Sequence, residues 1–510
     1  GFGSFSPDGK KVCYTPISRE FRTWKRYKGG RAADVWIYDL EKSLSKQLTN
    51  FKGSDQIPSW YKDKIYYASD ESLTLNIHAY DLKTGKSEQI TKHTEYDTMW
   101  PSGENNLLVY ENGGYIMKLN LDSGKESKIP VMIDYDGKST LPHFKNVKDN
   151  IGGMAISPSG KRALFDARGD IFSVPAKHGE IRNLTNTQGV RDMSPEWSPD
   201  GKYISFVSDR TGEYEIYIQD AGMNKAPVQM TKGSTAWKYT PLWSPDSKKL
   251  LYADRTHQLK FIDIITKKET VAGKGRSNDI FDYSWAPDSK WIVYSKSSAN
   301  NLNAVWVYSL ASGKAAQLTN DRFNDDSPVF STCGKYLFFR SNRDFNLSFS
   351  SFEFDYVYNR AAKIYALALG KNTPPLFKDK EDVEEGKKKS AAKKKEGAVS
   401  VAIDFDLADS RIVALPIASS NYFNIEALKG GILYNRRGTV YKFDIDKKKE
   451  EKVMSNVRGL VLSSDKKKGL YRSGSDYGII SIKPGNKPGA GKLKLAELKM
   501  KIEPLKEWKQ

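Results

Sequence analysis

The sequence predicts an all-β protein that contains two consecutive β-propellers. Three observations predict this fold: a turn-forming tetrapeptide recurs, a strand-rich stretch follows each copy, and the copies are regularly spaced. The copies are Ser6-Pro7-Asp8-Gly9, Ser157-Pro158-Ser159-Gly160, Ser198-Pro199-Asp200-Gly201, Ser244-Pro245-Asp246-Ser247 and Ala286-Pro287-Asp288-Ser289. The last four begin 41, 46 and 42 residues apart. A period of about 40–50 residues made of short strands is typical of propeller blades.

Each repeat contains the same elements in the same order. In the third copy an aromatic residue and its turn, 197–201, precede a strand of β-branched and aromatic residues at 202–207. A second turn at 209–212 leads into an alternating strand at 214–218. Pro suits the second position of a type I turn, Asp bonds the local backbone, and Gly tolerates a left-handed conformation. A closing strand that resembles Gln-Leu-Thr occurs at 47–49, 89–91, 183–185, 229–231 and 317–319.

Counting the repeats divides the chain into two propellers. Three blades fit residues 5–130, and seven fit residues 150–483. The seven are expected to begin at Met154, Trp197, Trp243, Trp285, Phe330, Ile403 and Leu460. Seven blades form a closed ring, whereas three do not, so we expect about three further blades before residue 1.

The predicted domains follow from this count. Residues 1–149 are the C-terminal part of a six-bladed propeller, and residues 150–490 are a seven-bladed propeller. Residues 491–510 are predicted to be a linker that enters a helical domain missing from this chain. Within the second propeller, residues 378–397 carry eight Lys against six acids. Mixed charge without apolar partners does not offset its ordering entropy, so this run is predicted to be a mobile loop.

Composition excludes several classes of protein. The net charge is +19, of which residues 1–33 carry +6 and residues 483–510 carry +5. Much of the remaining +8 is scattered as lysines at turn exits, which favours a solvated surface over nucleic-acid binding. No apolar run approaches the roughly 18 residues of a membrane-spanning helix, so no membrane span is expected. Two cysteines in 510 residues cannot form a disulfide framework. No signal peptide is visible and the N-terminus looks trimmed, so the compartment, cytoplasmic or periplasmic, is not assigned.

A search for an active site finds no catalytic residue. None of the five histidines lies in a His-x-x-x-His pair, and neither a Cys-x-x-Cys nor a Gly-x-Ser-x-Gly pattern occurs. His178 lies in a Lys-His-Gly turn and is interpreted as a surface residue. Asp321, Asp325 and Asp326 could hold a cation, but propeller turns of this kind usually satisfy their own backbone. No cofactor and no metal are therefore expected.

The least generic strings resemble one family. They are Ser18-Arg19-Glu20-Phe21-Arg22-Thr23-Trp24-Lys25-Arg26-Tyr27, Tyr110-Glu111-Asn112-Gly113-Gly114, Phe172-Ser173-Val174-Pro175-Ala176-Lys177-His178-Gly179, Ala427-Leu428-Lys429-Gly430-Gly431-Ile432-Leu433-Tyr434 and Ile502-Glu503-Pro504-Leu505-Lys506-Glu507-Trp508. These strings resemble tricorn-type serine proteases, and the resemblance extends over essentially the whole chain. It implies a six-bladed and a seven-bladed propeller, followed by helical, PDZ-like and catalytic domains.

The resemblance implies that catalysis and substrate access are carried out by different domains. The serine nucleophile and its histidine lie in the later domains of that family, so this chain is expected to hydrolyse no peptide alone. Its propellers are expected to scaffold the enzyme and to gate the access of peptide substrates. The downstream domains of the same protein are its expected partners, and a homo-oligomer is possible.

A basic insertion at 15–34 is the most suggestive segment for binding. Its aromatic residues are interleaved with six basic residues: Arg19, Arg22, Lys25, Arg26, Lys28 and Arg31. Arginine forks pair well with carboxylates, and Arg22, Lys25 and Arg26 are the predicted binding residues. In the tricorn family an adjacent basic pair anchors the C-terminal carboxylate of peptides, and Lys25-Arg26 is the nearest match, with a lysine in place of one guanidinium. The simpler interpretation is a solvated insertion that packs against a neighbouring domain.

Two other functions remain open at this stage. One is a free-standing module that binds a protein partner, like the propeller of the Tol–Pal system. The other is the gating propeller of a prolyl-oligopeptidase-type hydrolase. The family-specific strings favour the tricorn interpretation over both.

Overall fold

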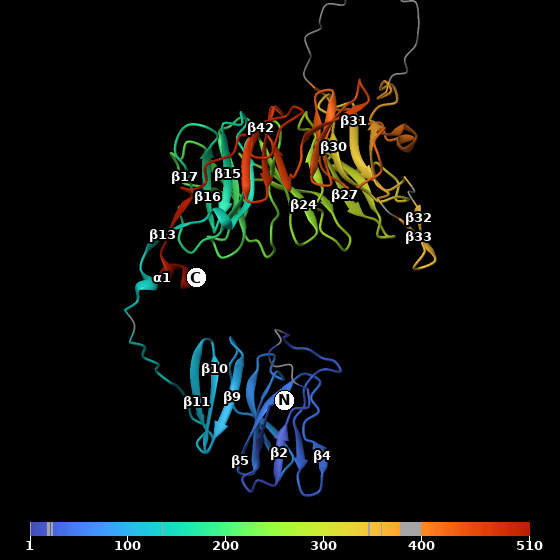
Figure 1. Cartoon of the computed structure of the whole chain (residues 1–510). Coiled ribbons are helices and arrows are strands. Elements are labelled where there is room, and N and C mark those ends of the chain that lie inside the picture. Colours follow the sequence, from blue (N-terminus) through green and yellow to red (C-terminus); the bar gives the residue numbers. More distant parts are fainter. Residues whose placement is uncertain are drawn as a thin grey trace, which may run out of the picture. The chain divides into compact units, whose positions relative to one another are not determined.

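The computed structural model describes residues 2–17, 21, 24–134, 136–344, 347–358, 360–377 and 399–509. Almost all regular structure in these residues is β-strand, which confirms the predicted all-β class. The chain divides into two compact units, Gly1–Asp136 (unit 1) and Gly137–Gln510 (unit 2), drawn in Figure 1. The predicted mobile loop at 378–397 lies outside the described residues.

In its described residues, unit 1 contains three antiparallel four-stranded sheets, each built from consecutive strands. They are β1 (Gly3–Phe5), β2 (Lys11–Tyr14), β3 (Trp36–Asp39) and β4 (Leu44–Gln47); β5 (Asp55–Tyr61), β6 (Lys64–Ser69), β7 (Asn76–Asp81) and β8 (Ser87–Gln89); β9 (Thr98–Glu104), β10 (Leu107–Asn112), β11 (Tyr115–Asn120) and β12 (Glu126–Lys128). The first strand of the middle sheet, β5, contacts both β1 and β9. Buried side chains such as Ile77 and Leu108 fill the space between the second and third sheets.

In the described residues, unit 2 contains seven sheets of three or four strands, which form the blades, and two further two-stranded sheets. The first four are β14 (Ile151–Ile156), β15 (Arg162–Ala167), β16 (Asp170–Pro175) and β17 (Arg182–Asn183); β18 (Asp192–Trp197), β19 (Tyr203–Ser208), β20 (Glu215–Asp220) and β21 (Val228–Gln229); β22 (Leu242–Trp243), β23 (Lys249–Ala253), β24 (Gln258–Asp263) and β25 (Glu269–Lys274); β26 (Tyr283–Trp285), β27 (Trp291–Ser297), β28 (Asn303–Ser309) and β29 (Lys314–Gln317). The last three are β30 (Asp325–Phe330), β31 (Tyr336–Ser341), β34 (Lys363–Ala368) and β35 (Ile412–Ala414); β36 (Tyr422–Leu428), β37 (Gly431–Arg436), β38 (Thr439–Asp444) and β39 (Lys449–Met454); β40 (Gly459–Leu462), β41 (Lys468–Ser473) and β42 (Asp476–Ser481).

The seven sheets close into a ring. Strand β14 of the first sheet contacts β40 and β41 of the seventh. Phe165 and Phe172 from the first sheet share one buried cluster with Leu470 and Tyr477 from the seventh. The seventh sheet has three strands, and an isolated bridge between Gly478 and Lys492 lies where a fourth would pair.

One predicted blade boundary was wrong. Ile403 does not begin the sixth blade, because it lies between β34 and β35 of the fifth sheet and packs on that sheet's core. The sixth sheet begins at Tyr422 instead. In the sequence, the charged run at 378–397 comes between β34 and β35, so the last strand of the fifth sheet is far from its third. The other six expected positions each lie in the first strand of a sheet.

The repeated turn links neighbouring blades as well as neighbouring strands. The Ser198 hydroxyl donates to the Asp200 carboxylate at 2.7 Å, which closes the turn locally. The Asp200 amide then donates to the hydroxyl of Ser247, in the next blade's turn, at 3.1 Å. Asp246 and Ser289 repeat this bond one blade further on, at 3.0 Å. Both serines adopt a positive φ, 58° and 60°, at the position that glycine occupies in other copies.

The two ends of unit 2 pair with each other outside the ring. Strand β13 (His143–Asn146) pairs antiparallel with β43 (Lys499–Ile502). The expected helix entrance is a short helix, α1 (Pro504–Trp508), and Glu507 pairs with Arg168 through two bonds of 2.5 and 2.9 Å. The described residues also contain three short 3₁₀ helices: η1 (Lys138–Thr140), η2 (Lys148–Asn150) and η3 (Ala408–Arg411).

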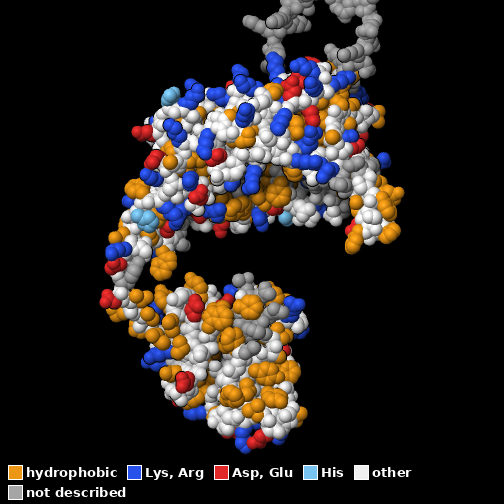
Figure 2. Space-filling view, viewed as in Figure 1, with side chains coloured by type: hydrophobic (Ala, Val, Ile, Leu, Met, Phe, Trp, Pro, Cys, Tyr) orange, Lys and Arg blue, Asp and Glu red, His pale blue; other side chains and the backbone are white. Residues whose placement is uncertain are grey.

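A hairpin of β32 (Leu347–Ser350) and β33 (Asp355–Tyr358) is inserted between β31 and β34. Its turn exposes Phe352 and Phe354, and Figure 2 shows hydrophobic side chains gathered on it. The hairpin is an insertion in the fifth blade, because β31 and β34 pair directly with each other. Among the described residues, no helix is both long and apolar enough to cross a membrane.

Candidate functional site

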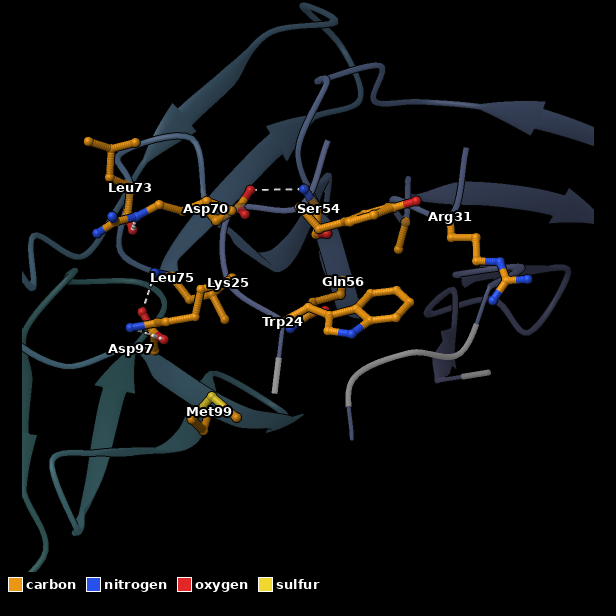
Figure 3. Close-up of a pocket in the computed structure, with 13 residues that line it drawn as sticks. Trp24, Lys25, Arg31, Ser54, Gln56, Asp70, Leu73, Leu75, Asp97 and Met99 are labelled. Carbon is orange, nitrogen blue, oxygen red and sulfur yellow. Dashed lines mark hydrogen bonds and ion pairs between the residues drawn. The ribbon is translucent and has the colours of Figure 1, made fainter. Parts of the chain in front are cut away.

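The basic insertion forms one wall of a pocket in unit 1, which we call the basic pocket (Figure 3). Its volume is about 260 Å³. The insertion contributes Trp24, Lys25, Arg26, Tyr27 and Arg31. The facing wall comes from the starts of β5 and β9 and from the loop before β7, with Ser54, Gln56, Asp70, Leu73, Leu75, Asp97 and Met99. The pocket therefore forms where an irregular segment covers the ends of regular blades.

Lys25 is held by an acidic partner. Its Nζ lies 2.9 Å from Oδ2 of Asp97, whose side chain is only 16% exposed. The other oxygen of Asp97 accepts a hydrogen bond from the Leu75 amide at 3.0 Å. This arrangement fixes the lysine against the wall and neutralises much of its charge.

Arg26 is held through the backbone. Its Nε donates to the Leu73 carbonyl at 3.0 Å, and its φ of 56° turns the chain sharply at this residue. The two terminal nitrogens make no hydrogen bond with the described residues. Because a guanidinium offers five N–H donors, most of its binding capacity remains available. Lys25 and Arg26 are adjacent in sequence and line one pocket, but Lys25 pairs with Asp97 and Arg26 bonds the Leu73 carbonyl.

Arg31 belongs to the same basic insertion but was not among the three residues predicted to bind, and it lines the same pocket. Figure 3 shows Arg31 on one side of Trp24 and Lys25 with Asp97 on the other. Within the described part of the chain its exposed guanidinium makes no hydrogen bond and no ion pair. The signal that could have identified it is its place at the end of the same basic insertion. The third predicted residue, Arg22, lies outside the described residues.

An aromatic pair supplies the apolar part of the pocket. The rings of Trp24 and Tyr27 lie 4.9 Å apart with an interplanar angle of 32°. Opposite them, Asp70 is buried and accepts a hydrogen bond from the Ser54 amide at 2.8 Å. Three basic side chains therefore face two carboxylates that already have partners. This combination suits an anionic group attached to an apolar chain.

Two of the three aspartates considered for a cation, Asp325 and Asp326, are instead paired with arginines. Asp325 accepts from Arg343 at 2.7 Å, and Asp326 accepts two bonds of 2.7 Å from Arg340. The expected backbone bonding is therefore not seen at these two residues, where guanidinium groups from β31 and the loop after it bond both oxygens of Asp326 and Oδ2 of Asp325. Across the described ranges, no three His, Cys, Asp or Glu residues group as metal ligands would.

A second cavity was missed by the sequence analysis. It lies inside the ring of unit 2, has a volume of about 760 Å³, and we call it the ring cavity. The first strands of the second to seventh sheets line it, including Trp197, Trp243 and Trp285 from the same position of three blades. The recurring Trp before the turn is the signal that could have indicated an aromatic lining.

Comparison with known proteins agrees with this architecture. Residues 151–483 match the family described as the tricorn protease second β-propeller domain, and residues 1–125 match the tricorn protease N-terminal β-propeller domain. A crystal structure of the tricorn protease superposes with a TM-score of 0.72 over 98% of this chain and 49% of that chain, at 17% identity. That likeness supports the fold.

Curated relatives carry related names. A tricorn protease homolog of Saccharolobus solfataricus is 23% identical over 511 residues, which cover 96% of this chain and 46% of that relative. A putative tricorn-like protease C-terminal subunit of Sulfurisphaera tokodaii is 24% identical over 91% of this chain and 54% of that relative. The chain thus spans about half the length of the curated relatives it matches. By its matches to both propeller domains, this chain belongs to the tricorn protease family and represents its propeller portion.

Proposed function

We propose that this chain scaffolds a tricorn-like serine peptidase and gates peptide access to a catalytic domain outside these 510 residues. The observation that carries the proposal is the basic pocket, which presents arginine donors beside an aromatic pair on a family-specific propeller. Names of the relatives support a protease, and their greater length leaves room for further domains. The proposal includes helical, PDZ-like and catalytic domains in the same protein and further blades before residue 1. It also includes assembly into a homo-oligomer.

Within this function, the basic pocket anchors the C-terminal carboxylate of a peptide. Arg26 supplies the principal fork, since its terminal nitrogens have no partner among the described residues, and Arg31 supplies a second. Lys25 contributes positive charge but keeps its bond to Asp97. Arg22 remains a predicted member of this set. The aromatic pair contacts the apolar part of the terminal residue.

The test is peptide binding by the 510-residue chain, measured by isothermal titration with one acetylated peptide in two forms. The form with a free C-terminal carboxylate is expected to bind about tenfold or more tightly than the amide, because charge-assisted hydrogen bonds contribute about 1.5–3 kcal/mol. Arg26→Ala should remove most of this preference, and Lys25→Ala should remove less. Lys42→Ala changes an exposed basic residue of the same unit outside the pocket and serves as the control.

Two results would count against the proposal. Equal binding of the free acid and the amide by the unmodified chain would refute the anchoring role. Hydrolysis of a fluorogenic peptide by the purified chain, blocked by a serine-directed inhibitor, would refute the assignment of catalysis to another domain. The free-standing Tol–Pal-type module has less support, because tricorn homologues match 96% of the chain.

A further inference from the structure

The walls of the ring cavity are aromatic and held in place by neighbouring blades. Trp243 donates its indole N–H to the carbonyl of Glu196 in the preceding blade at 3.4 Å. Trp285 donates in the same way to the carbonyl of Leu242 at 3.2 Å. Trp197 lines the cavity from the corresponding position of the second sheet. The same repeat position thus places rigid indole rings around one space.

The cavity also holds more acidic than basic side chains. Glu196, Asp282 and Glu426 line it together with Lys466. Lys466 pairs with Glu426 through an Nζ–Oε2 distance of 2.6 Å. The side chain of Glu196, by contrast, makes no hydrogen bond and no ion pair with any described residue. Glu196 and Glu426 occupy the same place in the second and sixth sheets, one residue from the aromatic or apolar position that precedes the turn.

Glu196 is affected by burial and by Glu426, which lines the same cavity. Burial, followed by the negative charge of Glu426, raises the pKa of Glu196 to about 8. A carboxyl group in this state lacks a compensating cation, which a ligand could supply. Burial, followed by the charge of Asp326, also raises the pKa of Asp282.

The chemistry of the lining selects the kind of cation. Indole faces attract ammonium and guanidinium groups, and a carboxylate adds a charge-assisted hydrogen bond. A metal ion would need several oxygen or nitrogen ligands together, and the described residues contain no such group of three. An organic cation on an extended chain fits both the carboxylate and the aromatic walls.

We propose that the ring cavity binds the guanidinium or ammonium groups of peptides, with Glu196 as their counter-ion and the indoles of the first strands as their walls. This inference rests on the proposed function, because the ligand is taken to be a peptide. It adds a preference that the function itself does not require. Basic peptides would be retained in the ring, whereas acidic peptides would meet like charge.

The test uses the complete 510-residue chain and two pentapeptides, Ac-Ala-Ala-Arg-Ala-Ala-amide and the same peptide with citrulline in place of arginine. Citrulline keeps the shape of the side chain and removes its charge. Both termini are blocked, so the basic pocket has no carboxylate to bind. Isothermal titration at about pH 9, where Glu196 is ionised, should show about tenfold tighter binding of the arginine peptide.

Substitutions assign the preference to one carboxylate. Glu196→Gln keeps the size of the side chain and should reduce the preference to below about threefold. Glu213→Gln makes the same change at an exposed turn outside the cavity and should leave it intact. Thermal unfolding of both variants checks that they are folded. Lowering the pH to about 6 should weaken the binding of the arginine peptide to the unmodified chain, because Glu196 then binds a proton.

Comparing the unmodified chain with Glu196→Gln also separates the effect of Glu196 from the effects of other groups that titrate in the cavity. Asp282, Tyr283, Glu426 and Lys466 also line it, and their effects persist in Glu196→Gln. Burial raises the pKa of Tyr283, which keeps the phenol neutral at this pH. A pH dependence that is identical in the unmodified chain and in Glu196→Gln would overturn the role of Glu196.

The remaining outcomes separate this inference from the proposed function. Equal binding of the arginine and citrulline peptides would overturn the inference and leave gating of peptides intact. Binding of N-acetylarginine amide as tight as that of the pentapeptide would overturn the assignment to peptides, since a free small cation would then suffice. Failure of the carboxylate preference in the basic pocket would refute the anchoring role alone, because the blocked pentapeptides do not use it.

Discussion

The basic pocket of unit 1 and the ring cavity of unit 2 are built in opposite ways from one chain. The basic pocket depends on a segment that departs from the blade repeat, and Lys25 and Arg26 both come from it. The ring cavity depends on the repeat itself, which places Trp197, Trp243 and Trp285 at one position of three blades. The sequence of the basic pocket can therefore change without altering a blade, whereas the ring cavity exists only if the seven blades close into a ring.

The two sites also differ in charge. Three basic side chains and two partnered carboxylates line the basic pocket. Three carboxylates and one lysine line the ring cavity. Opposite charges of this kind suit different groups of a peptide, a terminal carboxylate in one site and basic side chains in the other. Separate variants should therefore affect the two sites independently.

The strongest way to break this comparison is to open the ring. Phe165 is fully buried and its ring lies 4.9 Å from that of Tyr477, at the seam between the first and seventh sheets. Phe165→Ala should lower the free energy of unfolding of unit 2 by about 3–5 kcal/mol. Binding of the arginine peptide should weaken, while the carboxylate preference of the basic pocket should persist.

The matched control for this change is Phe352→Ala, at the exposed turn of the β32–β33 hairpin. It should shift stability by less than about 0.5 kcal/mol, because no buried contact is lost. Denaturant unfolding followed by tryptophan fluorescence measures both variants. If Phe165→Ala abolished the two binding activities together, the sites would not be independent.

A second test uses the pH dependence of stability. The pKa of Glu196 is raised in the folded chain, to about 8, above its value in the unfolded chain, so the folded state binds the extra proton. Stability is therefore lost as pH rises from about 4.5 through about 8. Glu196→Gln has no carboxyl group at this position and does not lose this stability. Its melting temperature should therefore rise relative to that of the unmodified chain as the pH increases from about 5 to about 9.

Glu213→Gln controls for the loss of one negative charge in the same unit. Its melting temperature should follow that of the unmodified chain at each pH. A constant difference between Glu196→Gln and the unmodified chain over this range would show that Glu196 is not protonated in the folded state. The carboxylate of the ring cavity would then resemble that of an ordinary surface residue.

The smallest expected effect concerns the bonds between blades. Ser247→Ala removes the acceptor for the Asp200 amide and keeps the left-handed backbone, so it should cost about 1 kcal/mol. Ser247→Gly removes the same bond but relieves the backbone strain, so its cost should be close to zero. Urea unfolding of the two variants measures the difference. Equal costs would show that the strain at this residue is negligible.

Much of the fold could be predicted because it is local. The Ser-Pro-Asp-Gly turn encodes its own hydrogen bonds, as Ser198 and Asp200 show, and six of the seven expected blade positions lie in first strands. The exception, Ile403, follows a charged run that interrupts the fifth blade. Sequence spacing cannot show that β35 returns to pair with β34 after such an interruption.

The site was predicted less completely for a similar reason. Lys25 and Arg26 were identified because a basic insertion stands out against the repeat. Their partners, Asp97 and the Leu73 carbonyl, come from other blades and are far away in sequence. The difference between a neutralised lysine and an available guanidinium therefore appears only in the folded unit.

By itself, the sequence determined the repeat, the strand content, the family and the location of the basic insertion. These are properties of short segments, where turn chemistry and side-chain alternation act over a few residues. The tertiary structure alone decided that the ring closes between β14 and β40, that Glu426 raises the pKa of Glu196, and that Lys25 pairs with Asp97. Such contacts join residues that are distant in sequence, and their positions follow from the packing of whole sheets.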